Sequence, residues 1–140
     1  MSGNKILRAV LLISLTILGA KFLWTGFFAF KAVETVGQAQ VKIAAKDVER
    51  IGLVLDMLWY GYDLDETDHK PFKTTHYDVF CEKIQEIMAR YTGMPANLPS
   101  GQNFASFSYS GSEKSYRITV KAKDKNRTVV HGTPERVWHE

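Results

Sequence analysis

The first thirty residues constrain this chain most. Residues 9–30 read AVLLISLTILGAKFLWTGFFAF and contain a single charge, Lys21. A membrane span needs about 20 predominantly apolar residues, so this stretch is long enough. Its Leu, Ile, Val and Phe side chains favour insertion by roughly 5 kcal/mol in total, which exceeds the cost of about 3 kcal/mol for one central lysine. The segment predicts a membrane anchor helix over residues 1–30.

Two other interpretations of this segment stay open. Lys5 and Arg8 followed by the apolar run 9–20 also resemble a secretory signal peptide, although cleavage after Ala20 would put Leu18 where a small residue is required. A buried helix of a soluble protein is the third interpretation. With the anchor retained and its short basic start inside, we expect a single-pass membrane protein whose C-terminal domain is periplasmic or extracellular.

The anchor also supplies the candidate site residues. Its two charges inside or beside the apolar run suit a partner carboxylate or a lipid phosphate, its glycines allow close approach of another helix, and its aromatic side chains suit an interface belt. The candidates for membrane contact and helix assembly are Arg8, Gly19, Lys21, Trp24, Gly26, Phe27 and Phe28. The expected partners are membrane lipids and other membrane helices, either from further copies or from other subunits.

The charge distribution argues against a nucleic-acid partner. The chain has a formal net charge of +3, and residues 1–30 hold three basic residues and no acidic one. The remainder is therefore electrically balanced, and the high pI is a property of the anchor end. The single cysteine, Cys81, rules out an intramolecular disulfide.

The rest of the chain predicts one soluble α+β domain over residues 31–140. No proline precedes Pro71, and apolar residues recur at alternating spacings of three and four from Val41 to Tyr62, which predicts a helix over 31–60 that continues the anchor. An acidic loop follows at 61–74, then a short helix at 75–92. Alternation of period two predicts a three-stranded antiparallel meander over 103–133. The predicted fold is a long N-terminal helix packed on this small sheet, with a second short helix.

Candidate chemistry is weak throughout. Asp63, Asp65 and Asp68 suit Ca²⁺, but the EF-hand pattern lacks its glycine and its closing glutamate, so a solvated acidic loop is favoured. No zinc-ligand spacing connects the four candidate ligands, which are His69, His76, Asp78 and Cys81. A nucleophile and base formed by Cys81 and His131 would need proximity that sequence does not reveal. We therefore predict no cofactor, no metal and no enzymatic activity.

The meander is locally basic. Six cations lie along it, namely Lys114, Arg117, Lys121, Lys123, Lys125 and Arg127. A solvated face is the favoured interpretation, followed by a surface for lipid headgroups or for an acidic partner. No aromatic residue is interleaved with these cations on the predicted face, so a nucleic-acid platform is not expected.

Two stretches carry a resemblance to a known family. Residues 44–65, AAKDVERIGLVLDMLWYGYDLD, look like the amphipathic half-helix of type IV pilins and pseudopilins leading into their variable loop. Residues 107–138, FSYSGSEKSYRITVKAKDKNRTVVHGTPERVW, look like the closing meander of that family. The processing signal of the family differs here, because Gly3 is followed five residues later by Arg8 instead of a glutamate.

This resemblance implies a membrane-anchored structural subunit that assembles through its N-terminal helix, as in a filament. Two alternatives remain from the residues themselves. One is a single-pass accessory subunit of a larger membrane protein complex. The other is a membrane-tethered domain that binds a ligand.

Overall fold

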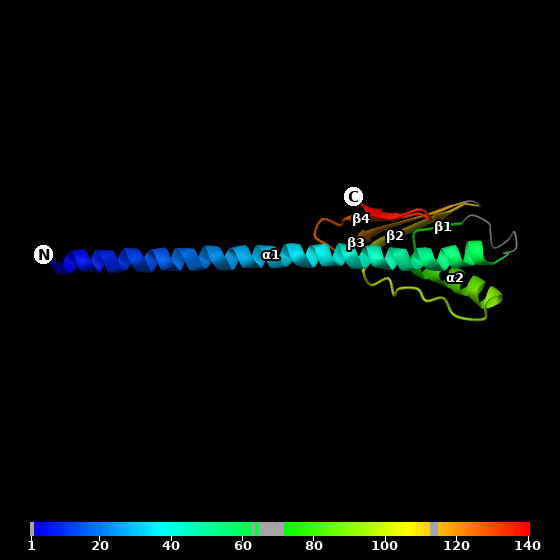
Figure 1. The fold of residues 1–140 in the computed structure, drawn as a ribbon, viewed down its shortest axis with the longest axis horizontal. Coiled ribbons are helices and arrows are strands. Elements are labelled where there is room, and N and C mark those ends of the chain that lie inside the picture. The colour runs from blue at the N-terminus through cyan, green and yellow to red at the C-terminus, as the bar shows by residue number, and fades with distance from the viewer. Residues whose placement is uncertain (1, 63, 65–71, 113–114) are drawn as a thin grey trace. The chain divides into compact units, whose positions relative to one another are not determined.

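A computed structural model gives the fold of this chain. It describes residues 2–62, 64, 72–112 and 115–140, and in the first helix it leaves out the side chains of residues 2–7, 9, 22 and 25–34. The elements, in chain order, are α1 (Ser2–Gly61), β1 (Lys73–Thr74), α2 (Tyr77–Tyr91), β2 (Phe104–Gly111), β3 (Tyr116–Ala122), β4 (Val129–Gly132) and β5 (Val137–His139). Figure 1 shows these elements along the chain.

The chain divides into two compact units, Met1–Val36 and Gly37–Glu140. Helix α1 contributes its first part to the first unit and the remainder to the second. The second unit contains all the strands of the described residues, together with α2 and the part of α1 that carries the apolar stripe.

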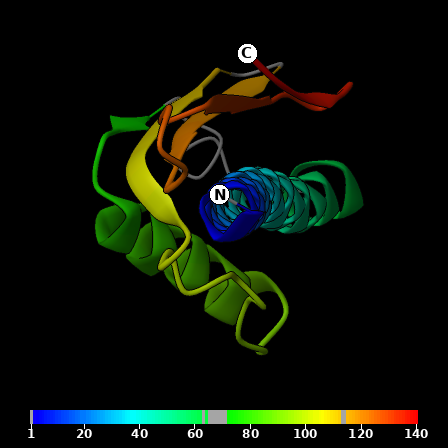
Figure 2. The same cartoon turned by 90° about the vertical axis from the view of Figure 1, so that its left-hand side faces the viewer.

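The second unit has two layers. Its sheet is antiparallel with strand order β1-β2-β3-β4-β5, so each strand pairs with its neighbour in the chain. Helix α2 and the second part of α1 lie on the same face of this sheet (Figure 2). Within the part of the chain that the structure describes, no helix covers the other face, which we call the outer face.

The regular spacing of apolar residues in the sequence explains how the second part of α1 packs on the sheet. Ala44, Val48, Ile51, Leu55 and Leu58 are fully buried, and their spacings of three and four residues place them on one side of the helix. Each such aliphatic side chain contributes about 1.5–3 kcal/mol when it leaves water, with alanine contributing less. The stripe is therefore the main attachment of α1 to its unit.

Helix α2 is held by an aromatic cluster. The ring centroid of Phe80 lies 5.2 Å from that of Phe107 and 4.8 Å from that of Tyr109, both on β2. Tyr77 meets Phe107 edge-on at 5.0 Å, and its hydroxyl donates a hydrogen bond of 2.5 Å to the carbonyl of Pro99. Such pairs add about 0.5–1.5 kcal/mol each beyond the area they bury. The helix ends at Tyr91 with Thr92 as its C-cap, and Gly93 follows with a positive φ of 68°, a conformation common after helix ends.

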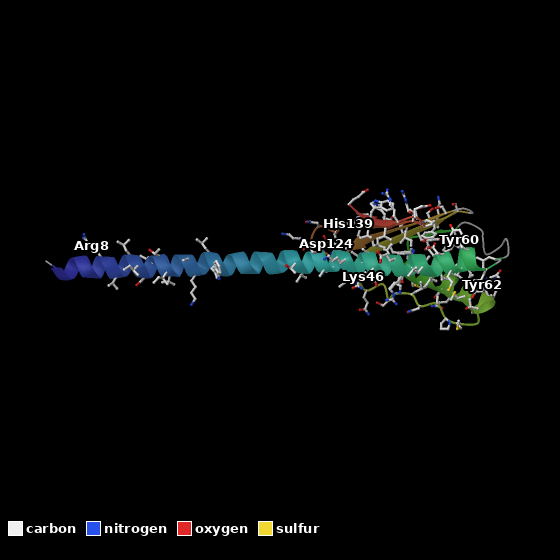
Figure 3. The ribbon with its side chains drawn as sticks, viewed as in Figure 1. Arg8, Lys46, Tyr60, Tyr62, Asp124 and His139 are labelled. Carbon is white, nitrogen blue, oxygen red and sulfur yellow. The ribbon has the colours of Figure 1, made fainter. Side chains whose placement is uncertain are left out.

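The turn between β3 and β4 is closed by a buried aspartate. The Asp124 carboxylate accepts hydrogen bonds from the Thr128 amide at 2.8 Å and from the Thr128 hydroxyl at 2.6 Å. Burial acts to raise the pKa of Asp124, but the hydrogen bonds from Thr128 outweigh it, so the pKa lies below its ordinary value. Asp124 is labelled in Figure 3.

The predicted sheet of three strands is wrong, because the sheet has five. Strands β2, β3 and β4 account for the predicted meander, and β1 and β5 extend it on both edges. β1 has two residues and β5 has three, so neither is long enough to show a period of two in the sequence. The predicted single long helix also needs correction, because only the part of α1 from Gly37 onward belongs to the unit that contains the sheet.

The predicted membrane span is wrong as well. Among the described residues, no helix offers a stretch both long enough and apolar enough to cross a membrane. The single-pass topology and the periplasmic or extracellular placement that followed from it are therefore not supported.

Candidate assembly surface on the first unit

The first part of α1 presents large apolar side chains to solvent. Their exposed fractions lie between 56% and 78%, and they are Val10, Leu11, Leu12, Ile13, Leu15, Ile17, Leu18, Leu23 and Trp24. We call these nine residues the apolar collar. A contiguous exposed apolar surface of this kind is rare on soluble monomers and marks a site of association.

The apolar collar surrounds the helix. Val10, Leu11, Leu12 and Ile13 are consecutive, and successive helical residues are turned by about 100°, so these four alone point in all directions around the axis. Figure 3 shows side chains standing out on both sides of this part of α1. The apolar collar therefore has no polar side that would face water.

The hydroxyl groups inside the apolar collar are directed back to the helix. Ser14 donates a hydrogen bond of 2.8 Å to the Val10 carbonyl, and Thr16 donates one of 2.7 Å to the Leu12 carbonyl. Each hydroxyl proton is thus satisfied by the preceding turn. These two residues interrupt the apolar sequence without adding a donor that needs a partner outside the helix.

The predicted assembly residues fall on this surface in part. Arg8, Gly19, Lys21 and Trp24 are exposed on α1, and a Cβ built on Gly19 meets no atom within 4 Å. A neighbouring helix therefore finds open space at Gly19. The side chains of Phe27 and Phe28 and the surroundings of Gly26 lie outside the described residues.

The candidate metal site is not in the described part of the chain. Asp63, Asp65 and Asp68 all lie outside the described residues. Among the residues that are described, no group of three His, Cys, Asp or Glu side chains is placed to hold a metal ion. The zinc interpretation included His69, which is also outside the described part.

The structure separates the candidate nucleophile from its base. Cys81 lies on α2 and packs against the core, where burial raises the pKa of its thiol. His131 lies on β4 beside Thr119, with 3.3 Å between its Nδ1 and the threonine hydroxyl, on the outer face of the sheet. The sheet therefore lies between the two side chains, and they do not form a catalytic pair.

Sequence reasoning missed an aromatic residue on the outer face. Trp138 on β5 pairs with His131 on β4, and their rings stack with centroids 5.0 Å apart. The basic face was expected to lack aromatic side chains because β5 was not predicted. The only signal in the sequence was Val137-Trp138-His139 after a turn at Thr133–Arg136, which is too short to identify a strand.

Comparison of the chain with protein-family models, with curated proteins and with solved structures finds no match.

Proposed function

We propose that this protein is a structural subunit that assembles through the apolar collar on α1 with the same helix of other copies. The observation that carries the proposal is the exposure of nine large apolar side chains between residues 10 and 24. Each contributes about 1.5–3 kcal/mol if association buries it fully. An isolated subunit in water forgoes this stabilisation.

The distribution of the apolar collar favours an assembly of many copies over a dimer. A two-helix contact buries one stripe of each helix and leaves the other side in water. A helix that is apolar all round is stable when neighbours surround it. The proposed assembly therefore has a core of several α1 helices, as in a bundle or a filament. The resemblance of residues 44–65 and 107–138 to type IV pilins and pseudopilins is in keeping with this proposal.

The test compares two substitutions on different sides of the helix. Leu11→Glu and Ile13→Glu alter side chains that are separated by about 200° around the axis. If several helices surround each copy, both substitutions shift the purified full-length protein from large assemblies to monomers, as measured by sedimentation velocity and negative-stain electron microscopy. A simple two-helix contact would be broken by one substitution and tolerate the other.

The matched control is Leu53→Glu. Leu53 is 68% exposed on α1 in the second unit, so the same substitution changes the same kind of side chain outside the apolar collar. We expect the Leu53 variant to assemble like the wild type. Three results would overturn the proposal: a wild-type chain that stays monomeric at all concentrations, one that binds lipid vesicles without self-assembly, or one that is recovered only with a different protein in fixed ratio.

A further inference from the structure

We propose that copies also contact each other through their second units, with the cationic outer face of one sheet docked on an acidic stripe of α2 in the next copy. This inference rests on the proposed function, because it specifies a second contact within the same assembly. It is carried by two oppositely charged surfaces of the described residues that lie on opposite sides of one unit.

The outer face of the sheet collects cations. On β3, Arg117 and Lys121 are exposed while Ile118 and Val120 are fully buried, so the alternation of the strand places both cations on the outer face. Lys123 follows β3 at the same period. Lys73 on β1 joins them through Ser110, which pairs with Lys73 on one side and with Arg117 on the other.

In the part of the chain that the structure describes, these cations have no acidic neighbour within ion-pair distance. Among the described residues, no carboxylate lies within 4.0 Å of the Lys73, Arg117, Lys121 or Lys123 side chains. The strand β2 contributes Ser106, Ser108 and Ser110 between them, which are neutral hydrogen-bonding groups. The outer face therefore offers positive charge and hydroxyls to an anionic partner.

The aromatic residue on this face argues for a protein partner instead of a nucleic acid. The ring of Trp138 stacks on His131, and the guanidinium carbon of Arg136 lies 4.5 Å from the Trp138 centroid. His131 in turn has its Nε2 3.7 Å from Glu140 Oε2. Single-stranded nucleic acids bind sheets by stacking bases on free aromatic rings, whereas this ring is already occupied by its neighbours.

The complementary surface is on α2. Asp78, Glu82 and Glu86 are exposed and four residues apart, so they form one stripe along the helix. Glu86 already pairs with Arg90 at 3.1 Å, which leaves Asp78 and Glu82 as the principal carboxylates for another copy. Asp78 and Glu82 are about 6 Å apart along α2 at 1.5 Å per residue. Lys121 and Lys123 are about 7 Å apart at 3.3 Å per residue, so the two charge spacings match.

The two surfaces are suited to a repeating contact. Both helices lie on one face of the sheet, so the exposed side of α2 and the outer face of the sheet look in different directions (Figure 2). A contact between two different surfaces is heterologous, and each added copy leaves one surface of each kind available for the next. Such a contact extends an assembly without limiting it to a dimer.

The test is charge reversal with complementation in the full-length protein. Variant A carries Asp78→Lys and Glu82→Lys, and variant B carries Lys121→Glu and Lys123→Glu. Each variant alone places like charges in the proposed contact, so we expect at least a tenfold rise in the concentration at which assemblies sediment. Mixed in equal amounts, A and B restore complementary pairs between copies and should assemble near the wild-type concentration.

Isotope-labelled cross-linking identifies the contact directly. When ¹⁴N- and ¹⁵N-labelled wild-type copies are mixed and treated with a carbodiimide, we expect light-to-heavy cross-links that join Lys121 or Lys123 to Asp78 or Glu82. The matched control is Lys42→Glu with Lys46→Glu, which reverses two exposed charges on α1. Both residues lie on α1, which carries neither the cations of the outer face nor the acidic stripe of α2, so this control should assemble like the wild type.

The outcomes separate this inference from the proposed function. If A and B each assemble like the wild type, or if no light-to-heavy cross-link joins these residues, the sheet–α2 contact is wrong while assembly through the apolar collar stands. If the wild type itself never assembles and Leu11→Glu changes nothing, the proposed function is wrong and this inference falls with it. Circular dichroism of A and B establishes that each variant is folded.

Discussion

At the scale of single residues, two buried tyrosines on neighbouring strands have different surroundings. The Tyr116 hydroxyl donates to Asp56 Oδ1 at 3.0 Å and approaches the Gly52 carbonyl at 3.4 Å. The Tyr109 hydroxyl is buried, and none of the described residues gives it a hydrogen-bond partner. Burial raises the pKa of both hydroxyls, so both stay protonated at neutral pH.

The two tyrosines therefore predict opposite effects of the same substitution. Tyr109→Phe removes a polar group that has no partner among the described residues, and we expect the free energy of unfolding to stay equal or to rise by up to about 2 kcal/mol. Tyr116→Phe leaves Asp56 without its donor and should lower that free energy by about 1–2 kcal/mol. Urea denaturation of the two variants measures both effects. A clear loss of stability in Tyr109→Phe would mean that its hydroxyl has a partner in solution.

At the scale of elements, the contact between α1 and β4 depends on a glycine. A Cβ built on Gly132 would lie 2.5 Å from Cγ1 of Val48, and Val48 is fully buried in the stripe of α1. Any side chain at position 132 must therefore push the helix and the strand apart. The absent side chain allows the close approach of these two elements.

We expect Gly132→Ala to lower the free energy of unfolding by about 1–3 kcal/mol, because overpacking a core forces its neighbours to shift. Val48→Ala in the same chain should recover part of this loss, and a double-mutant cycle would measure the coupling between the two positions. Gly61→Ala is the control, because a Cβ there meets no atom within 4 Å. Equal stability of the wild type and the Gly132 variant would contradict the close packing.

The elements also differ in how far sequence could predict them. The stripe of α1 was predictable because burial on one side of a helix imposes a period that survives in the residues. The same holds for β3, where Tyr116, Ile118 and Val120 are buried as their alternation indicates. Strands β1 and β5 were not predictable, since they are short and exist by pairing with β2 and β4.

For the two candidate surfaces, the sequence predicted which residue types they contain better than it predicted where those residues lie in the fold. The exposed positions of Lys121 and Lys123 follow from local alternation. The stack of Trp138 on His131 instead depends on two strands joined by a turn. In this turn the Thr133 amide donates a hydrogen bond of 2.9 Å to the Arg136 carbonyl. In the first unit the residue types were equally evident, but the interpretation drawn from them was wrong. Its apolar residues were evident, but their number around Lys21 led to a membrane span that the described residues do not support.

At the scale of the whole molecule, the two proposed contacts respond to salt in opposite ways. The Debye length falls from about 10 Å at 0.1 M salt to about 3 Å at 1 M, which weakens contacts between exposed charges. Association of apolar side chains does not depend on charge and is strengthened by excluded salts such as sulfate. The assembly therefore has one salt-sensitive and one salt-resistant contact.

We expect 1 M NaCl to prevent the cross-links between Lys121 and Glu82 from forming. The wild-type assemblies held by the apolar collar, which Leu11→Glu breaks, should persist at this salt concentration. Sedimentation and cross-linking at 0.1 M and 1 M NaCl measure the two contacts on the same samples. Variant A mixed with variant B should show the same salt dependence as the wild type, because it keeps the same number of charge pairs. Loss of all assembly at 1 M NaCl would mean that charge, and not the apolar collar, holds the copies together.

The three tryptophans of the chain fall in three different surroundings. Trp24 belongs to the apolar collar and is 66% exposed, Trp59 packs against Tyr116 in the core with ring centroids 5.3 Å apart, and Trp138 lies on the outer face of the sheet. Each indole therefore emits from a distinct environment of the subunit. Chains that retain one tryptophan at a time would give separate fluorescence signals for joining of helices, unfolding of the core and docking of the sheet, with no added dye.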